Sequence, residues 1–298
     1  MRLSKCSNMD GKGVSVGDSL KIVWGDATIY DDCVEAVKAI DYLLCPMAFI
    51  SPEADRNPKM AKAVNTDAIK NLIKAVENEP NGAEHIKFVY IGTVAETGDR
   101  LPPIHHGRVG DPLKPSIFDF YACTKIAGER ALLESKIKHW VSFMENNTAE
   151  DAGRGLVNCI DVPDDSDFWR RVYNMAGGPN CRITYLDFMN ITYKMLGLDY
   201  RKVMERKWFA LRNFHMQYFD DSWVLNEYIH NWGDTLEDYK KRVWKNFPFY
   251  MKMVAIMCRI LPSFRHMVEK QTYKQLKKLA ERPDGTLGWI NNKNDMRI

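Results

Sequence analysis

The most constraining feature of the sequence is a regular alternation of β-type and helical segments over its first two hundred residues. Residues 86–91 form a β-rich apolar run, as expected of a strand that is buried on both faces of a sheet. Residues 58–79 carry apolar side chains at every fourth position from Val64 to Val76, which predicts an amphipathic helix. Such an alternation limits the chain to a few architectures, all of them built on a parallel sheet.

The remaining segments continue the pattern. We expect strands over 20–24, 41–45 and 171–175, and helices over 31–39, 121–135, 147–160 and 184–196. Strand, helix and strand in this order predict right-handed crossovers between parallel strands. The predicted fold class is therefore α/β, a Rossmann-like doubly wound parallel sheet with a mostly helical C-terminal region.

The character of the chain changes near residue 200, where aromatic residues become dense and helical patterning replaces alternation. We expect a cofactor-binding domain over residues 1–200 and a helical region over residues 201–298 that covers the substrate. The second part carries 19 Lys/Arg against 11 Asp/Glu, while the whole chain has a net charge of only +3. We interpret the surplus as a solvated basic face, and expect no nucleic-acid partner.

The composition indicates whether the chain inserts into a membrane, binds a metal and keeps its thiols reduced. The longest apolar stretch, 247–264, is interrupted by Lys252, Arg259 and Pro262, so we expect a packed helix and no stable membrane insertion. An interfacial membrane helix is the alternative. The seven cysteines are scattered without metal-ligand spacing, which predicts no metal site and reduced thiols in a cytoplasmic protein.

A chemically suggestive pair lies in the helix predicted over 121–135. Tyr121 and Lys125 are four residues apart and therefore share a helix face. An adjacent ammonium favours the phenolate, so we expect the pKa of Tyr121 to lie below its usual value of about 10. A phenol tuned in this way can exchange a proton with a substrate hydroxyl or carbonyl. The spacing alone is also common on solvated helices, which is the alternative interpretation.

Thr93 supports the catalytic interpretation. It follows the strand predicted over 86–91, and ligands bind at the carboxyl ends of parallel strands. We expect its hydroxyl to bind the same substrate oxygen as Tyr121. A plain strand-end turn residue is the alternative.

Several further segments, taken in order, resemble a known family. They are Trp24-Gly-Asp26, residues 44–48 (Leu-Cys-Pro-Met-Ala), Val64-Asn65 with Asn71-Leu72, Thr93 with Gly98, Tyr121 and Lys125 with Gly128-Glu129, residues 147–157 with Asp151 and Arg154, and residues 172–178. Their shared order over roughly residues 20–200 resembles the extended short-chain dehydrogenase/reductases, which include nucleotide-sugar epimerases, dehydratases and hydroxysteroid dehydrogenases.

The resemblance implies an NAD or NADP cofactor and hydride transfer at a carbon that bears a hydroxyl or carbonyl. It implies Tyr121 as the general acid/base, with Lys125 and Thr93 as its catalytic partners. Cofactor contacts are implied for Asp26, Ala48, Lys125 and Tyr121, and a structural role for Asn65. It also implies a homodimer formed through helices such as 121–135.

Two family features are not found. The strand and GxxGxxG loop that bind the pyrophosphate are absent, since residues 10–13 (Asp-Gly-Lys-Gly) lack both the strand and the spacing. The tens of residues that the family places before the helix at 147–160, which include a sheet strand, are also missing near 142/143. We expect the chain to be part of a longer polypeptide, with a degenerate gene product as the alternative.

Candidate substrate contacts are His105, His106 and Arg212. The two histidines lie in a stretch that borders the active site in the family, and guanidinium groups suit phosphate. Loop histidines and a solvated basic turn are the alternatives. Three functions remain open: an oxidoreductase for a small or apolar alcohol or ketone, a nucleotide-sugar epimerase or dehydratase, and a non-catalytic binding protein with a degenerate cofactor site.

Overall fold

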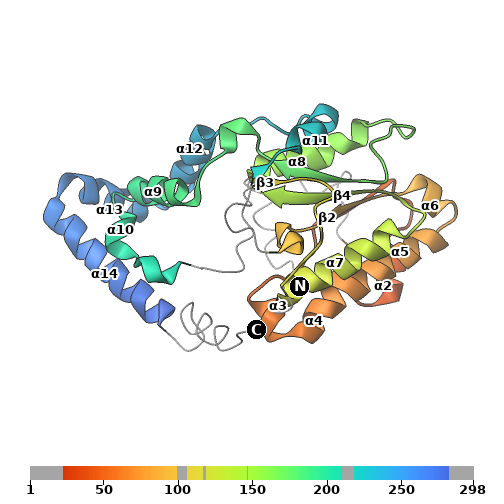
Figure 1. The fold of residues 1–298 in the computed structure, drawn as a ribbon, viewed down its shortest axis with the longest axis horizontal. Coiled ribbons are helices and arrows are strands. Elements are labelled where there is room, and N and C mark those ends of the chain that lie inside the picture. The colour runs from red at the N-terminus through yellow and green to blue at the C-terminus, as the bar shows by residue number, and fades with distance from the viewer. Residues whose placement is uncertain (1–22, 99–105, 117–118, 146, 210–217, 282–298) are drawn as a thin grey trace. The chain divides into compact units, whose positions relative to one another are not determined.

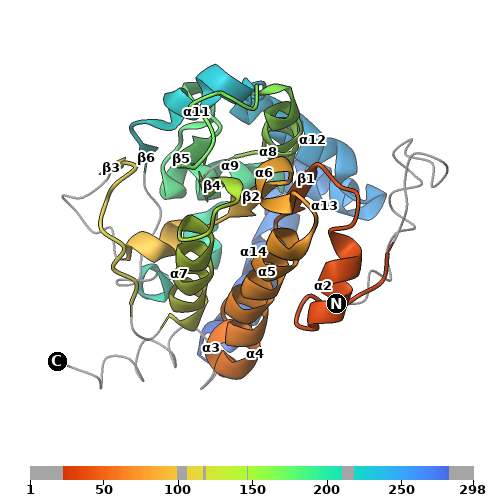
Figure 2. The ribbon, with the colours of Figure 1, turned by 90° about the vertical axis from the view of Figure 1, so that its right-hand side faces the viewer.

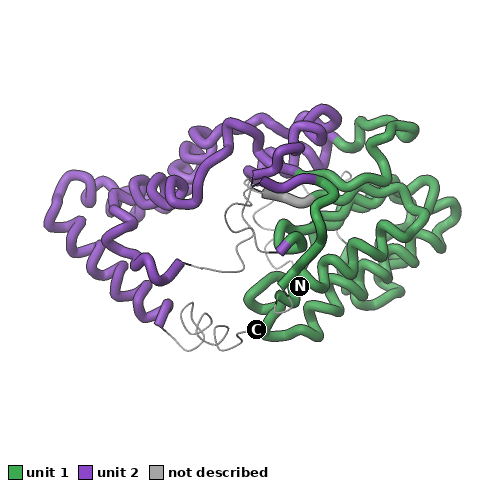
Figure 3. The backbone as a smooth tube through the Cα atoms, in the orientation of Figure 1, with its two compact units in different colours: residues 1–97, 109–144, 159–174 green, residues 98–108, 145–158, 175–298 purple. Residues whose placement is uncertain are grey.

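The computed structural model describes residues 23–98, 106–116, 119–145, 147–209 and 218–281 (Figure 1). The chain forms two compact units, and each contains segments that are distant in the sequence (Figure 3). Unit 1 comprises residues 1–97, 109–144 and 159–174, and unit 2 comprises residues 98–108, 145–158 and 175–298. The expected domain boundary at 200/201 falls inside unit 2, whose last segment begins at residue 175.

Unit 1 is built on a sheet with the strand order β1-β2-β4-β5. The strands are β1 (Tyr42–Cys45), β2 (Lys87–Ile91), β4 (Lys138–Glu145) and β5 (Arg171–Ala176), of which β5 enters unit 2 after Asn174. β1 and β4 both pair in parallel with β2, whose Phe88 faces Leu43 on one side and His139 on the other. The predicted parallel sheet is therefore confirmed.

Two expectations about strands were wrong. β4 was not predicted, and it runs without interruption through positions 142 and 143. Its buried Trp140 and Val141 explain why this segment forms a central strand. In the strand expected over 20–24, only Val23 and Trp24 are described, and both are exposed and outside any strand.

The helices α5 and α7 of unit 1 contact each other and lie side by side against this sheet, and α2 packs on α5 (Figure 2). Their bounds are α2 (Tyr30–Ala36), α3 (Glu53–Arg56), α4 (Pro58–Lys62), η1 (Ala63–Asp67), α5 (Ala68–Asn78), α6 (Gly82–His85), η2 (Val94–Thr97), α7 (Phe120–Leu133) and η3 (Cys159–Asp161). The core joins Ile69 and Leu72 of α5 to Phe88 and Tyr90 of β2. Burial of these apolar side chains is the main force that holds the helices on the sheet.

The helix predicted over 58–79 is present but is not uniform. It begins after Asn57, whose side chain accepts a hydrogen bond from the Met60 N–H at 3.1 Å, with Pro58 in the first turn. Its middle, η1, is a π-helical turn that lies between α4 and α5. Wide turns of this kind often occur at functional sites.

Unit 2 is mostly helical. It contains a two-stranded parallel sheet of β3 (His106–Gly107) and β6 (Tyr218–Phe219). Its helices are α8 (Ala149–Asn158), η4 (Pro179–Cys181), α9 (Tyr185–Met195), α10 (Tyr200–Val203), η5 (Arg206–Trp208), α11 (Ser222–Ile229), α12 (Leu236–Asn246), α13 (Phe249–Ile260) and α14 (Pro262–Ala280). The apolar stretch 247–264 is thus divided between α13 and α14 near Pro262, and among the described helices none is long and apolar enough to cross a membrane.

Asp151 on α8 is the polar centre of unit 2. Its fully buried carboxylate accepts hydrogen bonds from the backbone N–H groups of Gly233 (3.2 Å) and Asp234 (3.1 Å), and from the guanidinium of Arg154. Arg154 also donates to the carbonyl oxygen of Asn231 at 3.2 Å. One carboxylate therefore fixes the loop between α11 and α12.

We expect Asp151→Ala to lower the free energy of unfolding by about 1.5–3 kcal/mol, because two buried N–H groups and a guanidinium lose a charged acceptor. Urea unfolding of the full chain measures this change. The matched control is Asp165→Ala, which removes an exposed carboxylate and should have little effect. Equal stability of the two variants would contradict the structural role of Asp151.

Candidate active site

The helix α7, which carries the candidate residues Tyr121 and Lys125, begins at a defined cap. The Asp119 side chain accepts a hydrogen bond from the Ala122 N–H at 3.0 Å, which satisfies one free donor of the first turn. Tyr121 and Lys125 follow on one face of the helix. Tyr121 is partly exposed, while Lys125 is among the most deeply buried residues of the chain.

Thr93 follows the carboxyl end of β2, and its side chain lies close enough to Tyr121 to act on the tyrosine pKa. The expected direction of that pKa was wrong, however. Burial raises the pKa of Tyr121 above its usual value, and the nearby carboxylates of Glu96 and Asp119 raise it further, while the Thr93 side chain opposes them. The phenol is therefore protonated at neutral pH, which is the form that donates a proton to a carbonyl.

The ammonium of Lys125 bonds to groups other than Tyr121, and Lys125 is not among the causes named above for the tyrosine pKa shift. Its Nζ donates a hydrogen bond to the carbonyl oxygen of Ile91 at 2.6 Å and lies 4.0 Å from the centroid of the Tyr90 ring. Burial lowers the pKa of Lys125, and the carboxylates of Glu96 and Glu129 oppose that shift. An ammonium has three donors, so two remain for other acceptors at this site.

Asn65, in the π-helical turn η1, connects the parts of the site. Its side-chain oxygen accepts from the Phe49 N–H (2.7 Å), and its side-chain nitrogen donates to the Phe49 carbonyl oxygen (3.0 Å) and to Thr124 Oγ1 (3.0 Å). Phe49 lies just beyond β1 and Thr124 lies on α7. A single buried amide thus fixes the loop after β1 against α7, in agreement with a structural role.

The two further cofactor candidates lie in unit 1 with different surroundings. Ala48 is half-buried in the loop that Asn65 holds. Asp26 is exposed, and its Oδ1 accepts hydrogen bonds from the Thr28 N–H (2.9 Å) and hydroxyl (2.8 Å), which lower the pKa of the carboxyl. Its second carboxyl oxygen, Oδ2, takes part in neither bond.

The candidate substrate contacts belong to other parts of the chain. His105 and Arg212 lie outside the described residues. His106, in unit 2, bonds through Nδ1 to Asp220 Oδ1 at 2.5 Å, and Arg108 donates to the other oxygen of the same carboxylate. His106 therefore has a structural partner that joins β3 to the end of β6.

Two functional candidates were missed. Glu96, in η2, and Glu129, on α7, are buried beneath the catalytic pair, with 0% and 2% of their surfaces exposed. Glu129 was noted only as part of a family match, and Glu96 was not singled out. No local pattern identifies them, because their proximity arises only when η2 packs on α7.

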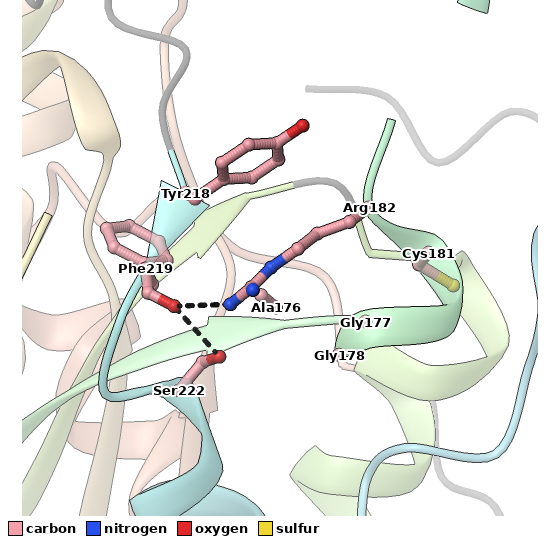
Figure 4. A pocket seen from close by; sticks show the side chains of 8 residues that line it. All are labelled: Ala176, Gly177, Gly178, Cys181, Arg182, Tyr218, Phe219 and Ser222. Carbon is pink, nitrogen blue, oxygen red and sulfur yellow. Dashed lines mark hydrogen bonds between the residues drawn. The ribbon is translucent and has the colours of Figure 1, made fainter. Parts of the chain in front are cut away.

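Unit 2 contains a small hollow of about 10 Å³, shown in Figure 4. It lies beside the Gly177-Gly178 turn, where Arg182 donates a hydrogen bond to the carbonyl oxygen of Phe219 at 3.2 Å and covers the Tyr218 ring. A space of this size holds about one water molecule, so it is no substrate pocket.

Comparison with known proteins places the fold. No family model matches the chain. Among solved structures, a UDP-glucuronic acid 4-epimerase from Bacillus cereus in complex with NAD matches with a TM-score of 0.53 and 15% identity over 79% of this chain and 83% of the epimerase. The dTDP-glucose 4,6-dehydratase DesIV from Streptomyces venezuelae, also with NAD bound, gives a TM-score of 0.60 and 15% identity over 80% and 82% of the two chains. A dTDP-4-dehydrorhamnose reductase from Bacillus anthracis, in complex with NADP, gives a TM-score of 0.50 and 14% identity over 67% of this chain and 79% of the reductase. The chain therefore has a Rossmann-type fold similar to that of these epimerase, dehydratase and reductase structures.

Within this Rossmann-type fold, ligands bind outside the carboxyl ends of the parallel strands. Ala48 follows β1 and Thr93 follows β2, so both lie at that edge of the sheet. Lys125 is held at the same edge by its bond to Ile91, the last residue of β2. The predicted site residues of unit 1, except for Asp26, therefore gather where this fold binds its ligands.

Proposed function

We propose that this chain is an NAD(P)-dependent oxidoreductase of the extended short-chain dehydrogenase/reductase type, with Tyr121 as its general acid/base. The observation that carries the proposal is the proximity of Tyr121 and Thr93 to each other beside the buried Lys125, whose Nζ donates to Ile91 at the carboxyl end of β2. Reversible hydride transfer needs a proton donor beside the reacting oxygen, and this arrangement supplies one.

The described residues fit the nicotinamide-ribose half of the cofactor. Lys125 is anchored at Ile91 and keeps two N–H donors, which suit ribose hydroxyls. The nicotinamide ring supplies or accepts the hydride when it is bound. Tyr121 then gives its proton to the substrate oxygen in reduction and takes it back in oxidation. The Thr93 hydroxyl orients the phenol and binds the same substrate oxygen.

Two substrate classes follow from this chemistry. Our first expectation, from the dense aromatic residues of the C-terminal sequence, is a small or apolar alcohol or ketone. A nucleotide sugar is the second candidate, and the similar epimerase, dehydratase and reductase named above favour it. Epimerisation and dehydration begin with the same hydride transfer, so both use the same trio. The resemblance further suggests a cytoplasmic homodimer.

We expect the full-length protein to bind NADH or NADPH, and a fluorescence titration with each measures this. Lys125→Met should weaken binding by about tenfold or more, because a charged hydrogen bond contributes about 1.5–3 kcal/mol. The control Lys136→Met removes an exposed cation beyond the end of α7 and should leave affinity unchanged. Absence of binding to either nucleotide would favour a non-catalytic protein with a degenerate site.

A further inference from the structure

The strongest unexplained feature of unit 1 is the pair of buried acids below the catalytic residues. Glu96 and Glu129 are 33 positions apart in the sequence, but both are buried, and each carboxyl lies close enough to the other to act on its pKa. The Oε1 of Glu96 also accepts a hydrogen bond from the Thr93 N–H at 2.9 Å. The Oε2 atoms of both acids are buried, and no donor from the described residues reaches them.

Two adjacent carboxylates cannot bond to each other, because each ionised group is only an acceptor. One proton held between them would supply the donor that their buried Oε2 atoms lack among the described residues, as in other carboxyl pairs where like charges at close range prevent double ionisation. Accordingly, burial and the adjoining Glu129 raise the pKa of Glu96 well above its usual value. Burial also raises the pKa of Glu129, while the Glu96 carboxyl and the neighbours Lys125 and Arg130 oppose the shift.

The charged and titratable groups that face this pair come from every element packed around it. They are Lys125, Tyr121 and Arg130 of α7, Tyr90 of β2, and Cys45 of β1. Burial raises the pKa values of the Tyr90 phenol and the Cys45 thiol, so both are neutral at pH 7. Among these groups, Lys125 is the buried cation, and one negative charge on the pair balances it.

We propose that Glu96 and Glu129 form a single acid pair that holds one shared proton and one negative charge, and that Glu96 is thereby a positioning residue for the active site. The negative charge keeps Lys125 protonated in its buried position. The Oε1 of Glu96 fixes the backbone of Thr93, whose side chain lies beside Tyr121. This inference concerns the same site as the proposed function and rests on it for its catalytic consequence.

The test uses the full chain with Glu96→Gln, Glu129→Gln, the double variant, and Glu134→Gln as the matched control. Glu134 is an exposed glutamate at the C-terminal end of the same helix. Infrared spectroscopy at neutral pH should show the C=O stretch of one protonated carboxyl group in the wild type and in the control. Each single variant should lose that band, because the amide replaces the protonated member of the pair and leaves the other ionised. A wild type without the band, or a single variant that keeps it, would overturn the proposal.

A second readout needs no catalysis. In the folded wild type the pair holds one proton, whereas both glutamates are ionised in the unfolded chain at neutral pH, so the contribution of the pair to stability falls as the pH rises above the usual glutamate pKa of about 4.3. One proton corresponds to a tenfold change in the unfolding equilibrium constant for each pH unit. Glu96→Gln should remove this dependence, whereas Glu134→Gln should retain it. Identical slopes in the wild type and Glu96→Gln would contradict the shared proton.

The effect of the acid pair on the active site is measured as the affinity for NADH or NADPH. The double variant leaves Lys125 without its counter-charge, so it should bind NADH or NADPH more weakly than the product of the two single effects. Strictly additive effects would show that the two acids act independently and would refute the pair. If the wild type binds neither nucleotide, the proposed function fails, while the infrared and unfolding results still decide the acid pair.

Discussion

Replacing Tyr121 by phenylalanine should reduce turnover by about 10²–10⁴-fold, the usual contribution of a positioned general acid or base. The ring remains, so folding and nucleotide binding should be retained and the loss should appear mainly in kcat. The assay is turnover of whichever ketone, alcohol or nucleotide sugar the wild-type protein accepts, with NADH or NADPH as the reporter.

The matched control for this variant is Tyr250→Phe, which removes an exposed hydroxyl on α13 in unit 2. It should turn over like the wild type. Turnover of Tyr121→Phe within about twofold of the wild type would exclude Tyr121 as the proton donor, since even a weak general acid contributes more.

Replacing Gly128 by alanine should destabilise the protein by about 1–3 kcal/mol, as expected when an atom is forced into a packed interior. A Cβ atom at this position would lie 2.4 Å from the Asn65 carbonyl oxygen and 3.2 Å from the Tyr90 hydroxyl oxygen. The carbonyl belongs to a helix backbone and cannot rotate away. The expected result is a lower urea midpoint, together with weaker nucleotide binding in the fraction that stays folded, because Asn65 holds the loop after β1.

The control is Gly153→Ala on α8, where a Cβ atom meets nothing within 4 Å. Since alanine is the better helix former by about 0.8–1 kcal/mol, this variant should be slightly more stable than the wild type. The stability changes of Gly128→Ala and Gly153→Ala should therefore have opposite signs. Equal changes would mean that α7 can move away from η1 without cost.

The parallel sheet and the helix that carries Tyr121 and Lys125 were predictable because their signals are local. The apolar run of β2 and the four-residue repeat of α5 are visible within a dozen residues, and Tyr121 and Lys125 are separated by one helical turn. β4 was missed because its residues 138–145 mix lysine, histidine and serine with apolar side chains. Its strand conformation depends on pairing with β2, which a single sequence does not display.

The electrostatics of the site could not be read from the sequence. The four-residue spacing suggested that Lys125 would tune Tyr121, yet the ammonium bonds to Ile91 and the phenol responds mainly to burial. Glu96 shows why. In the sequence, a carboxylate in a short turn resembles an ordinary solvated charge. In the fold, Glu96 has 0% of its surface exposed, and this burial raises its pKa.

The π-helical turn η1 also sets a limit on how this chain can vary. A wide turn accommodates one residue more than a regular α-helical turn, so deleting any one residue between Ala63 and Asp67 would restore the ordinary ladder at no cost in backbone hydrogen bonds. The same deletion would rotate the preceding residues by about 100° around the helix axis. A change that regularises the helix would therefore turn the Asn65 position away from Phe49 and Thr124. Homologous chains that keep this arrangement should conserve the length of the segment more strictly than its composition.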